Sequence, residues 1–96
     1  MRGRYTVVLH FAEFYFGPHL PGGGGVGDRI FHVFCNGQTL LRDFDIYKEG
    51  GSLRVVTKKF SGIQPSPQGK IHLTFQPVAN NATVSAIEIL DESPGR

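Results

Sequence analysis

The sequence predicts an all-β domain built as an antiparallel sandwich or barrel. Short runs of residues alternate between apolar and polar, which is the two-residue period of strands, and turns rich in Gly and Pro separate these runs. No segment of ten or more residues spaces its apolar side chains three and four apart, as an amphipathic helix would. Because residues 71–76 are apolar on one face only, a two-sheet sandwich fits them better than a parallel sheet covered on both faces.

The first strand is expected from Arg4 to Phe11, where β-branched and aromatic residues alternate. Four aromatic side chains fall within six residues at its end: Phe11, Phe14, Tyr15 and Phe16. This density is too high for one buried face of a strand, so we expect some rings in the core and others facing a ligand. The glycine run at 22–25 that follows is interpreted as a flexible loop between two strands.

A β-hairpin is the strongest local prediction. Arg29 to Cys35 alternates as a strand and ends at Asn36-Gly37, two residues that tolerate the positive φ angles of a type I′ turn. The returning strand begins at Gln38, and the turn should set the register of residues 31–35 against residues 39–44.

Three further strands are predicted in the second half of the chain. Leu53 to Phe60 is expected at a sheet edge, because lysines discourage pairing with other chains. Ile71 to Gln76 and Val84 to Leu90 follow, each after a loop. In the last of these strands, Ile87 and Ile89 are predicted to enter the core.

Composition restricts the classes of protein that the chain can represent. Its 96 residues suffice for one domain, with 40% hydrophobic and 19% charged residues. The net charge of +2 is scattered, with Lys58-Lys59 the only adjacent basic pair, so no nucleic-acid partner is expected. No apolar run approaches the roughly 20 residues of a membrane span, so no membrane insertion is expected. The first strand begins by about residue 4, an abrupt start that suggests further sequence upstream of residue 1 in the parent protein.

Several residue patterns are candidates for chemical sites. The glycine run lacks the Lys-Ser/Thr ending and the following helix of a phosphate-binding loop. Asp43 and Asp45 are either paired carboxylates for catalysis or calcium, or solvated and turn-capping groups, and the second interpretation is preferred. Cys35 is expected as a small buried hydrophobe.

Catalysis is not expected. The four histidines lack zinc-type spacing, and no serine near His10 and Glu13 stands in a nucleophile context. No metal and no cofactor are predicted. Asn81-Ala82-Thr83 is an N-glycosylation sequon, usable only if the chain passes through a eukaryotic secretory route.

Three blocks of the sequence together resemble a known family. YTVVLHFAEFYF, then DRIFHVFCNGQTLLRDFDI, then VSAIEIL occur in the order and spacing of the malectin family of carbohydrate-binding domains. The resemblance implies a jelly-roll-like β-sandwich, similar to galactose-binding-type domains. It also implies that residues 1–96 are a single malectin-like domain or its C-terminal portion, in which case the sandwich is incomplete.

The resemblance further implies a site. The aromatic pair that lines the family's sugar site corresponds to Tyr15 and Phe16, and an acidic residue before the last strand corresponds to Asn80, which lacks the charge-assisted bond of a carboxylate. Two further family aromatics would lie upstream of residue 1. An alternative for Tyr15 and Phe16 is simple packing under the glycine loop.

The function implied is non-catalytic binding of a glucose oligosaccharide or related glycan, as a module of a larger secreted, periplasmic or cell-surface protein. The alternative is a structural β-sandwich that makes protein contacts without sugar binding. In that case exposed sheet edges would support homo-oligomerisation.

Overall fold

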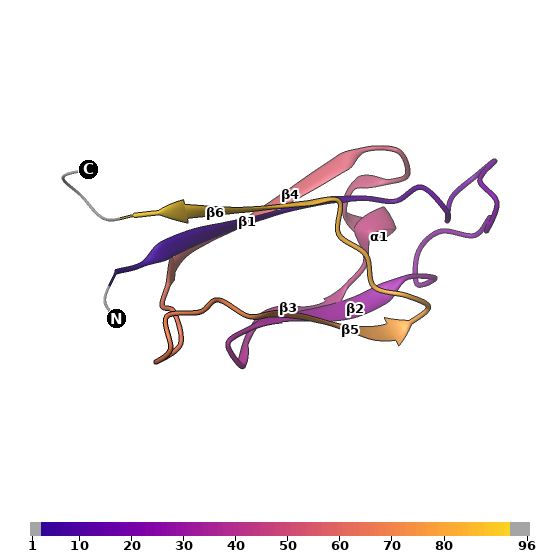
Figure 1. Cartoon of the computed structure of the whole chain (residues 1–96). Coiled ribbons are helices and arrows are strands. Elements are labelled where there is room, and N and C mark those ends of the chain that lie inside the picture. The colour runs from indigo at the N-terminus through magenta and orange to yellow at the C-terminus, as the bar shows by residue number, and fades with distance from the viewer. Residues whose placement is uncertain (1–2, 93–96) are drawn as a thin grey trace.

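A computed structural model describes residues 3–92 and shows two antiparallel sheets packed face to face (Figure 1). The predicted all-β sandwich is therefore confirmed. In chain order, the elements are β1 (Tyr5–Ala12), β2 (Ile30–Cys35), β3 (Gln38–Phe44), α1 (Ile46–Gly50), β4 (Val55–Ile63), β5 (Leu73–Ala79) and β6 (Ala86–Asp91). The last three strands each begin two residues later than predicted.

One sheet has the order β4-β1-β6, so β1 is its central strand. Val7, Leu9 and Phe11 on the inner face of β1 are fully buried. The pairing Val7↔Phe60 on one side and Val7↔Ile89 on the other fixes the register of both neighbours. The apolar alternation of β1 therefore becomes the middle of one wall of the core.

The other sheet has the order β3-β2-β5 and contains the predicted hairpin. Asn36 and Gly37 have φ angles of 50° and 83°, as a type I′ turn requires. Cys35 pairs with Gln38 and Phe31 pairs with Phe44, with two irregularities in the ladder between them. The prediction of a hairpin is thus confirmed, although bulges make its register less regular than expected.

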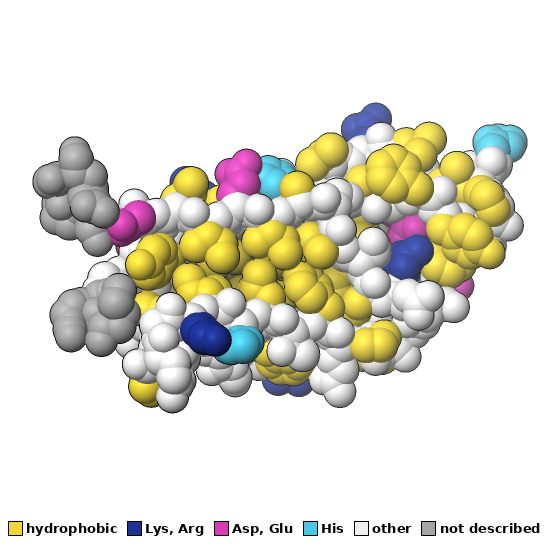
Figure 2. All heavy atoms as spheres, viewed as in Figure 1, with side chains coloured by type: hydrophobic (Ala, Val, Ile, Leu, Met, Phe, Trp, Pro, Cys, Tyr) yellow, Lys and Arg dark blue, Asp and Glu magenta, His cyan; other side chains and the backbone are white. Residues whose placement is uncertain are grey.

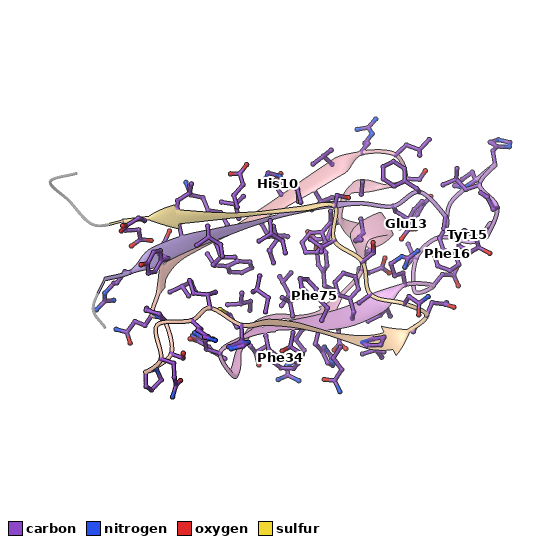
Figure 3. The ribbon with its side chains drawn as sticks, viewed as in Figure 1. His10, Glu13, Tyr15, Phe16, Phe34 and Phe75 are labelled. Carbon is purple, nitrogen blue, oxygen red and sulfur yellow. The ribbon has the colours of Figure 1, made fainter. Side chains whose placement is uncertain are left out.

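Aromatic rings fill the space between the sheets. The ring centroids of Phe11 and Phe44 lie 4.7 Å apart, and Phe31 is 5.8 Å from Phe11 and 5.6 Å from Phe44. Phe75 points into the same space, whereas Phe34 points away from it (Figure 3). Cys35 is also buried, as predicted, and this burial raises the pKa of its thiol.

The edge at β4 is closed by a lysine, and this strand does lie at a sheet edge as predicted. Lys58 pairs with Leu9, which places it toward the inner side of the sheet. Its Nζ lies 5.8 Å from the centre of the Phe44 ring and 2.9 Å from Oε1 of Glu49. An inward charge of this kind blocks the addition of another strand.

The opposite edge lacks such protection, and here the prediction for Ile87 and Ile89 was wrong. Both residues pair with buried positions of β1 and therefore share its inner face, yet they are 43% and 45% exposed. The reason is that β6 is an edge strand and no strand within residues 3–92 lies beyond it. Figure 2 shows the result as a continuous hydrophobic band between the two sheets, on the side where β5 and β6 lie.

Asp45 has the predicted capping role. Its side chain accepts hydrogen bonds from the backbone N–H of Lys48, at 3.1 Å, and of Gly27, at 2.6 Å. It therefore begins α1 and ties that helix to the loop before β2. Asp43 is exposed, with a φ of 52° in the irregular end of β3. The helix α1 was not predicted, because its five residues are too few to show the apolar spacing of a helix.

Candidate functional site

The candidate site lies where β1 gives way to the segment that leads to β2, and we define residues 17–28 of that segment as the glycine loop. Glu13, Tyr15 and Phe16 lie together at this end of the sandwich (Figure 3). Glu13 continues directly from the buried end of β1 and is itself fully buried. A carboxylate in such a position requires partners, and these partners organise the site.

The Glu13 carboxylate accepts four hydrogen bonds. Arg29 donates from Nε to Oε1 at 2.7 Å and from Nη2 to Oε2 at 3.2 Å. The backbone N–H groups of Tyr15 and Phe16 donate to Oε2 at 3.0 and 3.1 Å. Burial raises the pKa of Glu13, but the Arg29 bond and the two backbone bonds outweigh it, so the pKa lies below its ordinary value. Glu13 is therefore an ionised anchor that fixes the backbone of the aromatic pair.

Arg29 connects three segments of the chain. Besides its two bonds to Glu13, it donates from Nη1 to the backbone carbonyl of Asn81 at 2.6 Å. Its guanidinium carbon lies 5.2 Å from the centre of the Phe16 ring, within the range of a cation–π contact. The end of β1, the end of the glycine loop and the loop between β5 and β6 thus meet at this one side chain.

The aromatic pair divides between the surface and the interior. Tyr15 is 49% exposed, whereas Phe16 is 8% exposed, and their rings meet edge to face at 4.9 Å. The glycine loop packs against these rings, because Gly22 donates from its backbone N–H to the Tyr15 carbonyl at 2.8 Å. A Cβ at Gly22 would stand 2.6 Å from the Tyr15 ring. The glycines therefore do more than join two strands.

A pocket of about 420 Å³ opens beside these rings. Its lining residues are Tyr15, Phe16, Arg29, Asn80 and Asn81. Asn80 adopts a φ of 59°, which Asn tolerates better than most residues, and its Nδ2 donates to the Asp28 carbonyl at 2.5 Å. All three residues predicted for the site, Tyr15, Phe16 and Asn80, are thus brought to one pocket from distant parts of the sequence.

Arg29 and Asn81 line the pocket but were not predicted. A signal for Arg29 existed, because an acidic residue that continues an apolar strand implies a cationic partner, although the sequence does not say which one. Nothing in the sequence singled out Asn81 as a pocket residue.

The neighbouring Phe14 is 64% exposed and does not line the pocket. His10 and Glu13 do not form a joint catalytic group. His10 contacts Thr57 at 3.1 Å and Glu88 at 3.4 Å, while Glu13 is fully engaged by Arg29 and the backbone. Residues 3–92 contain no cluster of three potential metal ligands, and no helix among them is long and apolar enough to cross a membrane.

Chemically, the pocket combines an exposed ring with amide groups. A sugar presents an apolar C–H face that packs on such a ring, and hydroxyl groups that bond to amides and guanidinium N–H groups. The pocket volume falls within the roughly 300 to 1,000 Å³ typical of small-molecule sites. Among residues 3–92, no acidic side chain lines the pocket.

Fold and pocket together define a two-sheet β-sandwich domain with a pocket at one end, between the β1–β2 loop and the β5–β6 loop. A family model described as the malectin domain matches residues 1–87, and the chain belongs to the malectin domain family. The resemblance seen in the sequence is thereby confirmed.

Curated relatives with similar sequences include probable leucine-rich-repeat receptor-like serine/threonine-protein kinases of Arabidopsis thaliana. One is 40% identical over 60 residues, which is 62% of this chain and 6% of the kinase. Another is 34% identical over 76 residues, or 78% of this chain and 7% of the kinase. The chain therefore corresponds to a small part of the length of these relatives.

Solved structures with the same fold include a β-glucuronidase of Bacteroides uniformis. The crystal structure of that enzyme matches 95% of this chain and 10% of its own, with a TM-score of 0.77 and 18% identity. A second structure, of β-glucuronidase 2 of the same organism covalently bound to a cyclophellitol-6-carboxylate aziridine, matches 97% of this chain and 10% of its own. It has a TM-score of 0.75 and 17% identity. At this identity the likeness concerns the fold alone.

Proposed function

We propose that this chain is a non-catalytic glycan-binding module that binds a glucose oligosaccharide or a related glycan. Tyr15 provides the stacking surface, Phe16 supports it from below, and Asn80 bonds to sugar hydroxyls. Arg29 orders the pocket wall and offers its remaining N–H groups. No cofactor takes part in this mode of binding.

The observation that carries the proposal is the convergence of Tyr15, Phe16 and Asn80 on one pocket of about 420 Å³. The family resemblance named these three residues without reference to distance. Their meeting at a half-exposed ring is the arrangement that sugar binding needs. The competing interpretation, in which both rings only pack under the glycine loop, accounts for Phe16 but not for a Tyr15 that is 49% exposed.

The expected affinity is low. Stacking on one ring contributes about 0.5 to 1.5 kcal/mol, and each net hydrogen bond contributes about 1 kcal/mol. One ring and a few amide and guanidinium bonds therefore give a total close to the −4 kcal/mol that corresponds to a millimolar Kd.

The non-catalytic part of the proposal follows from the acidic groups. Glycoside hydrolysis usually needs two carboxyl groups that flank the sugar bond. Glu13 is the acidic residue bonded to the pocket wall, yet it is buried, and its lowered pKa makes it a poor proton donor. Turnover of any member of a chromogenic glycoside panel would overturn this part.

The test is a titration of glucose oligosaccharides followed by NMR chemical shifts of the chain. Tyr15→Ala should abolish the shifts, because it removes the stacking surface. The matched control is Phe14→Ala, which truncates an adjacent and more exposed ring outside the pocket and should leave the shifts intact. The proposal would be contradicted if the Tyr15 variant showed the same chemical-shift changes as the wild-type chain, or if both variants lost them equally.

A second candidate function rests on a different observation, the open side of the sandwich. The β4 edge is blocked by an inward lysine, whereas the β6 edge presents the inward-facing Ile87 and Ile89 with no such charge. This asymmetry favours a second copy of the chain against β5 and β6.

The expected result for this second function is a dimer in size-exclusion chromatography with light scattering. Ile87→Lys combined with Ile89→Lys should convert it to a monomer. Val55→Lys changes a residue at the other edge that is 70% exposed, and should leave the dimer intact. A monomeric wild-type chain would eliminate this function.

We also propose that residues 1–96 form a single malectin-like domain, or the C-terminal portion of one, within a larger extracytoplasmic protein. Two findings support this: the family match over residues 1–87, and the small share of the receptor-like kinases that the chain covers. In the parent protein we expect a secretion signal at the N-terminus and the malectin match further along the same chain.

A further inference from the structure

Asn81 lies in the loop between β5 and β6 and is both exposed and part of the pocket lining. It also begins Asn81-Ala82-Thr83, the only Asn-X-Ser/Thr triplet in the 96 residues that has a residue other than proline in its centre. This triplet is the acceptor sequence for N-glycosylation. The modification sequence and the candidate sugar pocket thus share one residue.

The backbone around Asn81 is held in place. Its carbonyl accepts the 2.6 Å bond from Nη1 of Arg29, and the preceding Asn80 donates to the Asp28 carbonyl. Within residues 3–92, the side-chain amide of Asn81 makes no hydrogen bond of its own. A group attached to this amide would therefore break no bond of the fold, and it would begin at the pocket wall.

We propose that Asn81 is N-glycosylated when the chain passes through a eukaryotic secretory pathway, and that the attached glycan covers the pocket. The reaction uses a lipid-pyrophosphate-linked oligosaccharide as co-reactant. The Asn81 amide nitrogen forms a bond to C1 of the first sugar and gives up one proton, while the C1–O bond breaks and the lipid pyrophosphate leaves with its electron pair.

The effect on the pocket follows from effective concentration, and this part rests on the proposed function. A sugar tethered by a short linker acts at a concentration on the order of millimolar. The affinity expected for this pocket is also near millimolar, so a tethered glycan competes with a free one on equal terms. Glycosylation should therefore weaken binding of a free glucose oligosaccharide by about two- to tenfold.

The experiment uses the full chain secreted from eukaryotic cells behind an added signal sequence. Thr83→Ala destroys the acceptor triplet but leaves Asn81 in place, and Thr74→Ala, an exposed substitution in β5, is the matched control. Intact mass before and after treatment with a glycan-removing amidase should change for the wild type and the Thr74 variant, and stay constant for the Thr83 variant. A wild-type chain without glycan would overturn the proposal.

A second measurement reports on the pocket without any added sugar. Nitration of Tyr15, quantified by peptide mapping against Tyr5, should be several-fold lower in the glycosylated chain than in the Thr83 variant. Equal nitration in both would overturn the claim that the glycan covers the pocket.

Titration with a glucose oligosaccharide then separates the two proposals. If the Thr83 variant binds and the glycosylated chain binds more weakly, both stand. If the Thr83 variant does not bind while the mass change and Tyr15 protection persist, glycan recognition by the pocket fails and the assignment of Asn81 stands.

Discussion

Replacing Glu13 by Gln should destabilise the domain strongly, because Glu13 is the buried hub of the site. Gln keeps one carbonyl oxygen for the N–H groups of Tyr15 and Phe16. However, it places an amide N–H₂ against the Nε–H of Arg29, so donor meets donor. The charge-assisted bond from Nε to Oε1, which contributes about 1.5 to 3 kcal/mol, is lost, and the bond from Nη2 now ends on a neutral oxygen instead of a carboxylate. Water reaches the freed N–H group because the Arg29 side chain is 13% exposed. The expected loss of unfolding free energy is about 2 to 4 kcal/mol, slightly less than for a wholly buried pair.

Urea unfolding and thermal melting measure this change. For a domain of this size, the loss corresponds to a fall in Tm of roughly 10 to 25 °C. Glu49→Gln is the matched control, since it makes the same chemical change in the 2.9 Å pair with Lys58, where Glu49 is 44% exposed. That control should shift the unfolding free energy by no more than about 1 kcal/mol. A Glu13 variant as stable as the Glu49 variant would refute the role of Glu13 as the anchor.

The same substitution should change the response to acid. The folded-state pKa of Glu13 is lowered, so its contribution is fully present above its unfolded value of about 4.3 and is lost as pH falls through the folded pKa. The gap in stability between wild type and Glu13→Gln should therefore narrow below about pH 4. Glu92, whose pKa is also lowered by bonds from the Thr6 hydroxyl and the Gly62 N–H, keeps some acid sensitivity in both chains.

Three further predictions concern other parts of the chain. Gly22→Ala places a Cβ 2.6 Å from the Tyr15 ring and 2.8 Å from the ring of the buried Phe16, so both rings must shift, binding of a glucose oligosaccharide should weaken several-fold and Tm should fall; unaltered Tyr15 ring signals in NMR would contradict this. Gly37→Ala should lower the unfolding free energy by about 1 to 2 kcal/mol, because φ is 83° there, and an unchanged urea midpoint would mean that the turn adopts another type. Burial raises the folded pKa of Cys35, so stability should be full below the unfolded value of about 8.5 and fall as pH rises through the folded one. Urea midpoints at pH 7 and pH 9.5 should differ more in wild type than in Cys35→Ala.

Local signals were sufficient for the strands and the hairpin. Alternation reports which residues share a face, and Asn36-Gly37 reports where the chain reverses. Alternation does not report whether a face is covered. Ile87 and Ile89 point inward as predicted but remain exposed, because their burial depends on neighbours beyond β6 rather than on their own pattern.

Only part of the candidate site could be predicted, because the remaining residues depend on contacts between distant segments. The family resemblance identified Tyr15, Phe16 and Asn80, and all three line the pocket. Arg29 and Asn81 were missed because their roles depend on tertiary contacts: Arg29 bonds to Glu13 at the other end of the glycine loop, and to Asn81 just beyond the end of the neighbouring strand β5. No periodicity within one strand contains these contacts.

The order β4-β1-β6 also determines when the strands can pair while the chain is being synthesised. β1 leaves the ribosome before β4 and β6, its two partners, whereas β2 and β3 can form their hairpin as soon as Phe44 has emerged. Until Val55–Ile63 follows, neither hydrogen-bonding edge of β1 has its partner strand, and an apolar strand in that state is a ready substrate for a molecular chaperone. Such distant pairing belongs to the slow class of folding reactions, on the millisecond to second scale.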